Sequence, residues 1–280
     1  MIDDPIHEAI HRALAEDLAE ESDVTTDAII PPDTRGRARL IANEAAILAG
    51  CDAFEGALSE FDHDISVQWR AKDGDRVDRG DLVASVEGLL RAILTGERTA
   101  LNFVQRLSGV ATLTHRFVDA AGGVEIRDTR KTTPGLRALE KAAVRAGGGS
   151  NHRMGLHDAY LIKDNHIAVA GSIAEAVRRA REARPGLWIE IECETLDQVR
   201  EAVDARADEL LLDNMDVATI AEAVRLARGS ARMEASGGVT LATVADIART
   251  GVDSISVGAL THSAPAVDFS LEVEPDAPGR

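Results

Sequence analysis

The sequence is poor in the features that define several classes of protein. Its 280 residues include two cysteines, Cys51 and Cys193, and neither belongs to a CxxC pattern. A disulfide framework or a cysteine-ligated metal site is therefore not expected, and both thiols are predicted to be ordinary packed side chains. No stretch approaches the roughly 18 apolar residues of a membrane span, and the N-terminal residues lack the basic start and apolar run of a signal peptide. We expect a soluble, cytoplasmic protein without a membrane partner.

Positive charge is also scarce. The formal net charge is −17, and four of the 31 basic residues are lysine: Lys72, Lys131, Lys141 and Lys163. A nucleic-acid partner is not expected, because binding a duplex requires a basic face that neutralises phosphates. Acidity of this kind is typical of a surface that keeps a protein in solution.

One segment differs from this acidic background. Residues 127–166 contain eight arginines or lysines and four aspartates or glutamates, a local excess of four positive charges, to which His152, His157 and His166 add. A basic segment within an acidic chain favours an anionic small-molecule substrate, because the positive field is concentrated in one place. A solvated charged face would have the same composition, and composition alone does not separate the two.

The first part of the chain, residues 1–110, is predicted to form an α+β sandwich domain. An amphipathic pattern predicts a helix near 5–19, and alternating residues predict strands within 35–44 and 65–70. Residues 71–88 resemble a biotinyl or lipoyl carrier hairpin, but the available lysine, Lys72, precedes the turn. We therefore interpret this segment as sheet and turns.

Residues 89–121 are predicted to be helical, with Gly96 and Gly109 as breaks between helices. Beyond them, short apolar strands alternate with helices in six successive units, at 124–129, 159–164, 187–193, 209–214, 231–237 and 254–258. This rhythm predicts a parallel sheet in an α/β barrel over 111–265, closed or nearly closed, because no GxGxxG turn opens the series. The strand-like stretch at about 266–274 is expected to return to the first domain.

Polar or glycine residues stand where each apolar strand ends. They are Asp128, Thr129, Arg130 and Lys131 after the first strand, Lys163 after the second, Glu190 and Glu192 in the third, Asp213 and Asn214 after the fourth, Ser236, Gly237 and Gly238 after the fifth, and Gly258 after the sixth. The carboxyl ends of parallel barrel strands form one face, and that face carries the active site in such barrels. We therefore expect these residues to share one pocket.

Two carboxylates in this set favour a magnesium-bound substrate. Glu192 lies in an apolar strand, where a carboxylate is costly to bury without a partner. Together with Asp213 it could contact a Mg²⁺-bound pyrophosphate through water and accept hydrogen bonds from ribose hydroxyls. A salt bridge to a basic residue of the barrel would also explain Glu192.

Two loops follow the last two strands and favour a phosphate. Ser236, Gly237 and Gly238 are predicted to lie between a strand and a helix, so that backbone N–H groups and the helix N-terminus face an anion. Val257, Gly258 and Ala259 repeat the arrangement one strand later. Paired loops of this kind are the usual phosphate site of a barrel.

Cations complete the predicted site. Arginine forks bind planar carboxylates and lysines suit pyrophosphate oxygens, which makes candidates of Arg98, Arg130, Lys131, Arg153 and Lys163. Lys163 could alternatively form a Schiff base, as in barrel aldolases. His152 could bind a carboxylate or cap a loop.

Several stretches carry a resemblance to a known family. They are GERTALNFVQRLSG, DTRKTTPGLRALEKAAVRAGGGSNHRMGLHDAYLIKDNHI, IEIECET, LLLDN, EASGG and VGALTHSAPAVDFSL. Together they resemble the quinolinate phosphoribosyltransferase family, also called nicotinate-nucleotide pyrophosphorylase (carboxylating), from about residue 5 to 273. The resemblance implies an N-terminal sandwich domain, an incomplete α/β barrel, and transfer of a phosphoribosyl group from phosphoribosyl pyrophosphate to quinolinate with loss of carbon dioxide, in NAD biosynthesis.

The resemblance also implies residue roles. Arg130, Arg153 and His152 would bind the two carboxylates of quinolinate, with Thr129 and Lys131 nearby. Lys131, Lys163, Glu192 and Asp213 would form the catalytic set that serves phosphoribosyl pyrophosphate and its Mg²⁺, and the two loops would bind the 5-phosphate. Arg98 would enter the site of a neighbouring subunit, which implies a homo-oligomer, either a dimer or a hexamer.

Three other functions stay open. A homologue associated with molybdenum transport would keep the scaffold and change the substrate. A Schiff-base aldolase would use Lys163, and a noncatalytic carrier would use a modified Lys72.

Overall fold

A computed structural model describes residues 5–19 and 21–275 of the chain. The chain forms two compact units, each made of several segments. The first consists of Met1–His115, Thr132–Gly148 and Ser263–Arg280, and the second of Arg116–Lys131 and Gly149–His262. The segment Thr132–Gly148 therefore belongs to the first unit, although its sequence lies within the range predicted for the barrel. No helix among the described residues is long and apolar enough to cross a membrane.

The first unit is built on a four-stranded antiparallel sheet with the order β12-β1-β5-β3. Its elements are α1 (Pro5–Leu18), α2 (Val24–Ile29), β1 (Arg35–Ala42), β2 (Ala46–Ile47), α3 (Cys51–Ser59), β3 (Ser66–Trp69), β4 (Arg76–Val77), β5 (Leu82–Leu89), α5 (Arg137–Ala146), β12 (Phe269–Pro275) and most of α4 (Leu90–Ala121). Exposed and buried residues alternate along β1, as expected for a strand with one face on a core. The helix predicted near 5–19 and both predicted strands are confirmed.

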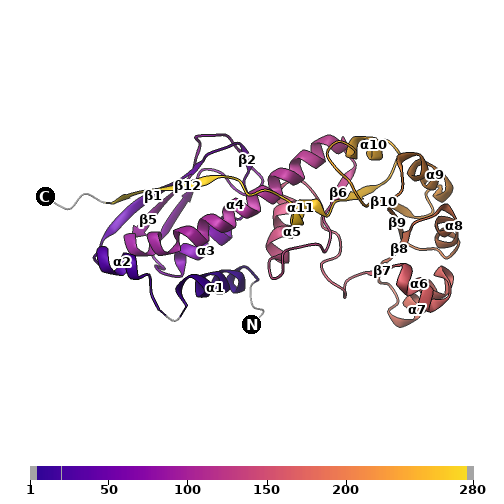
Figure 1. The fold of residues 1–280 in the computed structure, drawn as a ribbon, viewed down its shortest axis with the longest axis horizontal. Coiled ribbons are helices and arrows are strands. Elements are labelled where there is room, and N and C mark those ends of the chain that lie inside the picture. The colour runs from indigo at the N-terminus through magenta and orange to yellow at the C-terminus, as the bar shows by residue number, and fades with distance from the viewer. Residues whose placement is uncertain (1–4, 20, 276–280) are drawn as a thin grey trace. The chain divides into compact units, whose positions relative to one another are not determined.

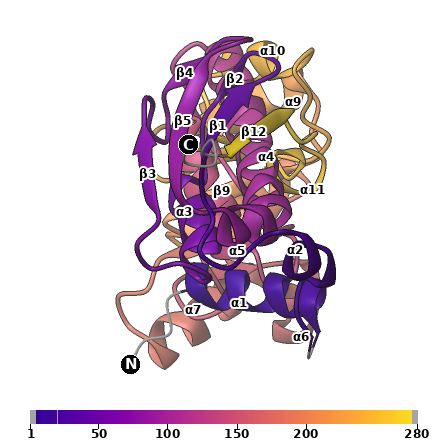
Figure 2. The same cartoon turned by 90° about the vertical axis from the view of Figure 1, so that its left-hand side faces the viewer.

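The last strand of the chain joins the first strand. Gly36 lies opposite Pro275 and Ala42 opposite Phe269 in an antiparallel register, so strands from distant parts of the chain share one sheet. Figure 1 and Figure 2 both show β12, in yellow, beside β1, in indigo.

The helix α4 corrects one prediction. It runs without a break from Leu90 to Ala121, through both glycines that were expected to end helices. A side chain at Gly109 would lie 2.0 Å from the carbonyl oxygen of Pro265, and one at Gly96 would lie 3.0 Å from that of Ala57. Both glycines therefore serve close backbone packing within a continuous helix.

The second unit is a six-stranded parallel sheet with helices beside its strands. Its elements are β6 (Glu125–Arg127), β7 (Tyr160–Ile162), α6 (Asp164–Ala170), α7 (Ile173–Ala183), β8 (Ile189–Cys193), α8 (Leu196–Asp204), β9 (Glu209–Asp213), α9 (Val217–Ala227), β10 (Arg232–Ser236), α10 (Val244–Ala248), β11 (Ser254–Ser256) and α11 (Ala259–His262). All six predicted strands are confirmed. Figure 1 shows α8 and α9 along one side of β8, β9 and β10.

The strand order defines an incomplete barrel. The sheet has the order β6-β11-β10-β9-β8-β7, so among the described strands it is open between β6 and β7. The inner strand β9 is buried along Glu209–Leu212, which explains the apolar run Leu210–Leu212. Side chains of Ser172, Thr195 and Asp216 accept backbone N–H bonds at the starts of α7, α8 and α9, so the helices begin directly after the strand-end loops.

Candidate active site

The carboxyl ends of the barrel strands surround a cavity of about 310 Å³. Its lining contains nine residues predicted from sequence: Thr129, Arg130, Lys131, His152, Arg153, Lys163, Glu192, Asp213 and Ser236. The convergence follows from the topology, because every strand of a parallel sheet points its carboxyl end to the same edge. Arg98 lies in the first unit, exposed on α4.

Two arginines in this cavity favour a bound anion. Burial and the neighbouring charge of Arg130 lower the pKa of the Arg153 guanidinium. The buried Nε atom of Arg130 has no hydrogen-bond partner, and Nη1 of Arg153 donates to the carbonyl oxygen of Ala159. Two guanidinium groups that disfavour each other need an anion close by, and a planar carboxylate matches their geometry.

His152 is oriented by the groups around it. The backbone N–H of Arg153 donates to Nδ1 over 2.7 Å, so Nε2 carries the ring proton and donates to Oε2 of Glu190 over 2.9 Å. Burial lowers the pKa of His152. The hydrogen bond and charge of Glu190 and the charge of Glu234 raise it by more, so the net pKa of His152 lies above its usual value. These two hydrogen bonds therefore hold the ring in one orientation at the wall of the cavity.

A buried charge cluster lies behind this wall. Nη1 of Arg127 donates to Glu209 over 2.8 Å and to Glu234 over 2.9 Å, and Nη2 lies 3.1 Å from Glu125. Burial lowers the pKa of Arg127, and these carboxylates raise it by more. Burial and the charge of Glu190 raise the pKa of Glu234 to about 7. One guanidinium thus balances carboxylates that the barrel interior would otherwise not accept.

The same cavity is also lined by two carboxylates, Glu192 and Asp213. Nζ of Lys163 pairs with Oε2 of Glu192, and Nδ2 of Asn214 donates to Asp213 over 2.7 Å. The alternative of a salt bridge between Glu192 and a basic residue of the barrel is therefore confirmed, and the partner, Lys163, is itself a predicted site residue. Glu192 and Asp213 line the same cavity and offer carboxylate oxygens, the ligands that Mg²⁺ prefers. Among the described residues they do not belong to any group of three close metal ligands, which suits contact through water better than an all-protein site.

A second cavity of about 230 Å³ adjoins the same strand ends. Its lining includes both predicted glycine loops together with Thr129 and Lys131, so Lys131 contributes to both cavities. Gly237 and Gly238 have φ angles of +90° and +61°, and a side chain at Gly237 would lie 2.3 Å from Oδ1 of Asn214. The first loop therefore requires glycine at both positions.

Ser236, Gly237 and Gly238 lie between a strand and a helix, as predicted, but the helix begins farther along the chain than a phosphate at its N-terminus requires. Residues 239–243 form a turn in which the backbone N–H of Thr240 donates to Oγ1 of Thr243, and α10 begins at Val244. The second loop does lead into a short helix, α11, at Ala259. The predicted helix N-terminus thus stands at one loop and not at the other.

Sequence reasoning missed several residues that line these cavities: Leu161, Leu211, Glu234, Thr240, Ser256 and His262. Glu234 and Ser256 had a detectable signal, since each is a polar residue within or at the end of a barrel strand. His262 and Thr240 follow strands by several residues and had no comparable signal.

Both cysteines behave as predicted. Burial, with the nearby Asp73 carboxylate, raises the pKa of the Cys51 thiol, and burial raises that of Cys193 to about 12. Both are free thiols that disfavour the reactive thiolate form.

An open parallel barrel with a cation-lined cavity and glycine loops at its strand ends defines an enzyme that acts on anionic, phosphate-bearing small molecules. Family models narrow this class. The model of the quinolinate phosphoribosyl transferase N-terminal domain matches residues 23–108, and that of the C-terminal domain matches residues 110–272. The chain therefore belongs to the quinolinate phosphoribosyltransferase family.

Similar proteins extend along nearly the whole chain. A probable nicotinate-nucleotide pyrophosphorylase [carboxylating] of Bacillus subtilis is 45% identical over 239 residues, which cover 84% of this chain and 83% of that protein. A mitochondrial quinolinate phosphoribosyltransferase [decarboxylating] of Nicotiana tabacum is 42% identical and covers 96% of this chain and 82% of its own. The crystal structure of NadC from Streptococcus pyogenes aligns with a TM-score of 0.93, 42% identity and 96% coverage of both chains.

Proposed function

We propose that this chain transfers the phosphoribosyl group of phosphoribosyl pyrophosphate to quinolinate and releases carbon dioxide and pyrophosphate, giving nicotinate mononucleotide for NAD biosynthesis. The observation that carries the proposal is the pairing of Arg130 with Arg153 in one cavity beside an oriented His152. A pyridine dicarboxylate supplies two negative charges in one plane, which is what two guanidinium forks and an imidazole bind. Family membership and the names of the relatives support the same substrate.

The second substrate fits the rest of the lining. The glycine loops at 236–238 and 257–259 line one cavity, where the backbone N–H groups of the glycines would bind the 5-phosphate. Lys131 and Lys163 offer point charges to pyrophosphate oxygens, and Glu192 and Asp213 offer acceptors to ribose hydroxyls. Mg²⁺ bound to the pyrophosphate would balance the charge of this leaving group, with Glu192 and Asp213 holding it through water.

The reaction then follows from positioning. The pyridine nitrogen forms a bond to the anomeric carbon while the bond to pyrophosphate breaks, and pyrophosphate takes the electron pair. Alkylation makes the ring nitrogen cationic, so the electron pair left on the adjacent carbon when carbon dioxide departs is stabilised before that carbon takes up a proton. The residues hold the two substrates in line and stabilise charge on the leaving group.

Oligomerisation belongs to the same proposal. Arg98 is exposed on α4, and it matches a family arginine that enters the neighbouring subunit's site. We therefore expect a homo-oligomer whose site is completed by Arg98 of a second copy. A cytoplasmic location stays a prediction of the sequence.

The test is an assay with quinolinate, phosphoribosyl pyrophosphate and Mg²⁺ that measures nicotinate mononucleotide and carbon dioxide together. We expect both products in equal amounts, and a loss on the order of a hundredfold in kcat/KM for Arg130→Ala, because each charge-assisted hydrogen bond contributes about 1.5–3 kcal/mol. The matched control is Arg200→Ala, which removes an exposed arginine on α8 that pairs with Asp197.

Two results would contradict the proposal. Folded protein that forms neither product would favour a homologue with an altered substrate. Borohydride trapping of a carbonyl compound on Lys163 would favour the aldolase, although the ion pair with Glu192 suits a cationic contact better than an uncharged nucleophilic amine.

A further inference from the structure

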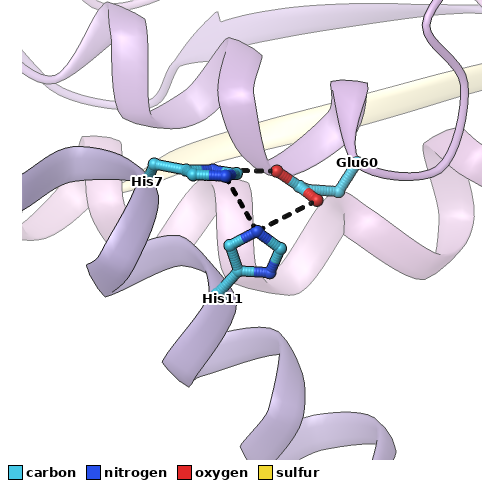
Figure 3. A group of neighbouring side chains, drawn as sticks. All are labelled: His7, His11 and Glu60. Atoms are coloured by element: carbon cyan, nitrogen blue, oxygen red, sulfur yellow. Dashed lines mark hydrogen bonds and ion pairs between the residues drawn. The ribbon is translucent and has the colours of Figure 1, made fainter. Parts of the chain in front are cut away.

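A second cluster of ligand-type side chains lies in the first unit, apart from the cavities at the barrel strand ends. His7 and His11 stand four residues apart on α1, which places them on the same helix face, and Glu60 directly follows α3. Figure 3 shows the two imidazole rings and the carboxylate turned toward one another. Their exposed fractions are 59%, 56% and 25%, so the cluster is open to solvent.

Close packing of the two helices produces this arrangement. Gly56 on α3 has no side chain, and a methyl group there would lie 2.6 Å from Cδ1 of Ile10. Ile10 is buried between the helices, and His7 and His11 flank it in sequence at the edge of the contact. The glycine therefore lets α1 approach α3 closely enough to bring both imidazoles to Glu60.

The distances suit one shared cation. Nε2 of His7 lies 3.0 Å from Nε2 of His11, Nδ1 of His7 lies 3.2 Å from Oε1 of Glu60, and Nε2 of His11 lies 3.6 Å from Oε2. One ligand atom from each of the three residues lies within 4.8 Å of the others. Because zinc binds nitrogen and carboxylate oxygen at about 2.0–2.2 Å, a single ion can reach all three residues with small side-chain rotations.

The sequence of α1 supports the same chemistry. Residues 7–11 read HEAIH, which matches the H-E-x-x-H pattern whose histidines bind zinc from one helix face. Two histidines and a glutamate at the end of a second helix form a ligand set that leaves a fourth position open. Glu8, the acid within the pattern, pairs with Arg12 over 2.5 Å, and none of the described cavities includes this cluster. The cluster therefore has ligands for a metal and lacks a substrate cleft.

A second group of three candidate ligands, His152, Glu190 and Glu234, does not support the same conclusion. The guanidinium of Arg127 already donates to Glu234 there and supplies the positive charge that a metal would bring. The contacts of the first cluster instead join His7, His11 and Glu60 to each other, and none of these contacts involves an arginine or a lysine.

We propose that His7, His11 and Glu60 form a surface site for a divalent transition metal, Zn²⁺ being the ion used to test it, which links α1 to α3. Imidazole and carboxylate together select Zn²⁺, Ni²⁺ or Cu²⁺ over Mg²⁺, so the site is chemically distinct from the magnesium contact of the proposed reaction. The strongly acidic chain also raises the local concentration of cations.

The experiment measures Zn²⁺ binding to tag-free, chelator-treated protein by competition with a chromogenic chelator, in excess Mg²⁺ and without substrates. We expect one Zn²⁺ per chain and a thermal midpoint that rises on the order of 5 °C at a hundredfold excess over Kd. His11→Ala and the nearly isosteric Glu60→Gln should each weaken binding by more than roughly tenfold, since changing even an outer contact of a metal ligand has that effect.

The matched control is His63→Ala, which removes another exposed histidine of the same unit and should bind Zn²⁺ like the parent. Thermal midpoints without metal show whether each variant is folded. Equal binding by the parent, His11→Ala and Glu60→Gln would overturn the proposal, as would binding that is lost in His152→Asn and kept in His11→Ala. Because no substrate is present, failure here leaves the proposed transferase activity untouched.

Discussion

Glu234 shows how a single buried carboxylate links the barrel interior to pH. Its side chain is fully buried, one oxygen accepts from Arg127, and the other, Oε1, has no hydrogen-bond partner. Burial and the charge of Glu190 raise its pKa from 4.5 to about 7. A raised carboxyl pKa means that the folded state binds the proton more tightly than the unfolded state does.

The sign of the pH effect follows. The stability that Glu234 contributes is fully present below about pH 4.5 and is lost as the pH rises through about 7. We expect Glu234→Gln to lower the free energy of unfolding by less at pH 8 than at pH 5.5. The reason is that the parent's carboxyl ionises over this range and the amide does not. Denaturant unfolding at the two pH values measures the difference.

Glu125→Gln is the control for this prediction. Burial raises the pKa of Glu125, but the charge and hydrogen bond of Arg127 lower it by more, so its net pKa lies below 4.5. Its contribution is present above pH 4.5 and is lost at lower pH, so its effect on the free energy of unfolding should be the same at pH 5.5 and pH 8. If Glu234→Gln changes the free energy of unfolding by the same amount at both pH values, the raised pKa of Glu234 is contradicted.

At the scale of elements, α4 joins the sheet of the first unit to the returning C-terminal segment. Gly109 faces the backbone of Pro265 directly. Three hydrogen bonds fix the segment near that contact: Arg106 donates to Ala264, Gln105 donates to Phe269, and Val267 donates to the carbonyl oxygen of Gln105. The segment therefore has little freedom to move away from the helix.

Gly109→Ala should destabilise the protein although alanine favours helix. The gain in helix propensity is at most about 1 kcal/mol, and the new methyl group would lie 2.0 Å from a backbone oxygen, an overpacking that costs typically 1–3 kcal/mol or more. At Gly96 the nearest atoms to a new methyl group lie at 3.0 Å, so Gly96→Ala should lose less stability than Gly109→Ala. Denaturant unfolding of both variants tests this order, and a Gly109→Ala variant as stable as the parent would refute the packing argument.

At the scale of the whole molecule, the proposed shared site predicts complementation between inactive variants. Arg98→Ala keeps an intact barrel cavity, whereas Arg130→Ala keeps Arg98 and loses a cavity arginine. If Arg98 acts in the neighbouring copy, a random equal mixture of the two, unfolded and refolded together, regains about a quarter of parental activity, because half of the dimers are mixed and one of their two sites is complete.

Controls show whether the regained activity comes from shared sites or from refolding itself. Each variant refolded by itself should stay inactive, and the Arg200→Ala variant, treated in the same way, should keep parental activity. A mixture no more active than its components would place Arg98 outside the neighbouring site.

Much of this organisation could be predicted from the sequence. The six barrel strands are short apolar runs with a polar residue at the end, and that local pattern fixed both their number and the residues that share the cavity. The turn after Gly238 and the unbroken path of α4 through Gly109 could not be predicted, because a glycine is equally consistent with a helix end and with close packing.

The sequence by itself determined the barrel rhythm, the family and most of the candidate site, because each depends on residue types in a local order. The tertiary structure alone decided the partners: Arg127 with Glu209 and Glu234, Lys163 with Glu192, and His7 and His11 with Glu60. These pairs join residues from 29 to 107 positions apart within the barrel. Spacing along the chain does not encode such contacts, since they form where packing brings separate elements together.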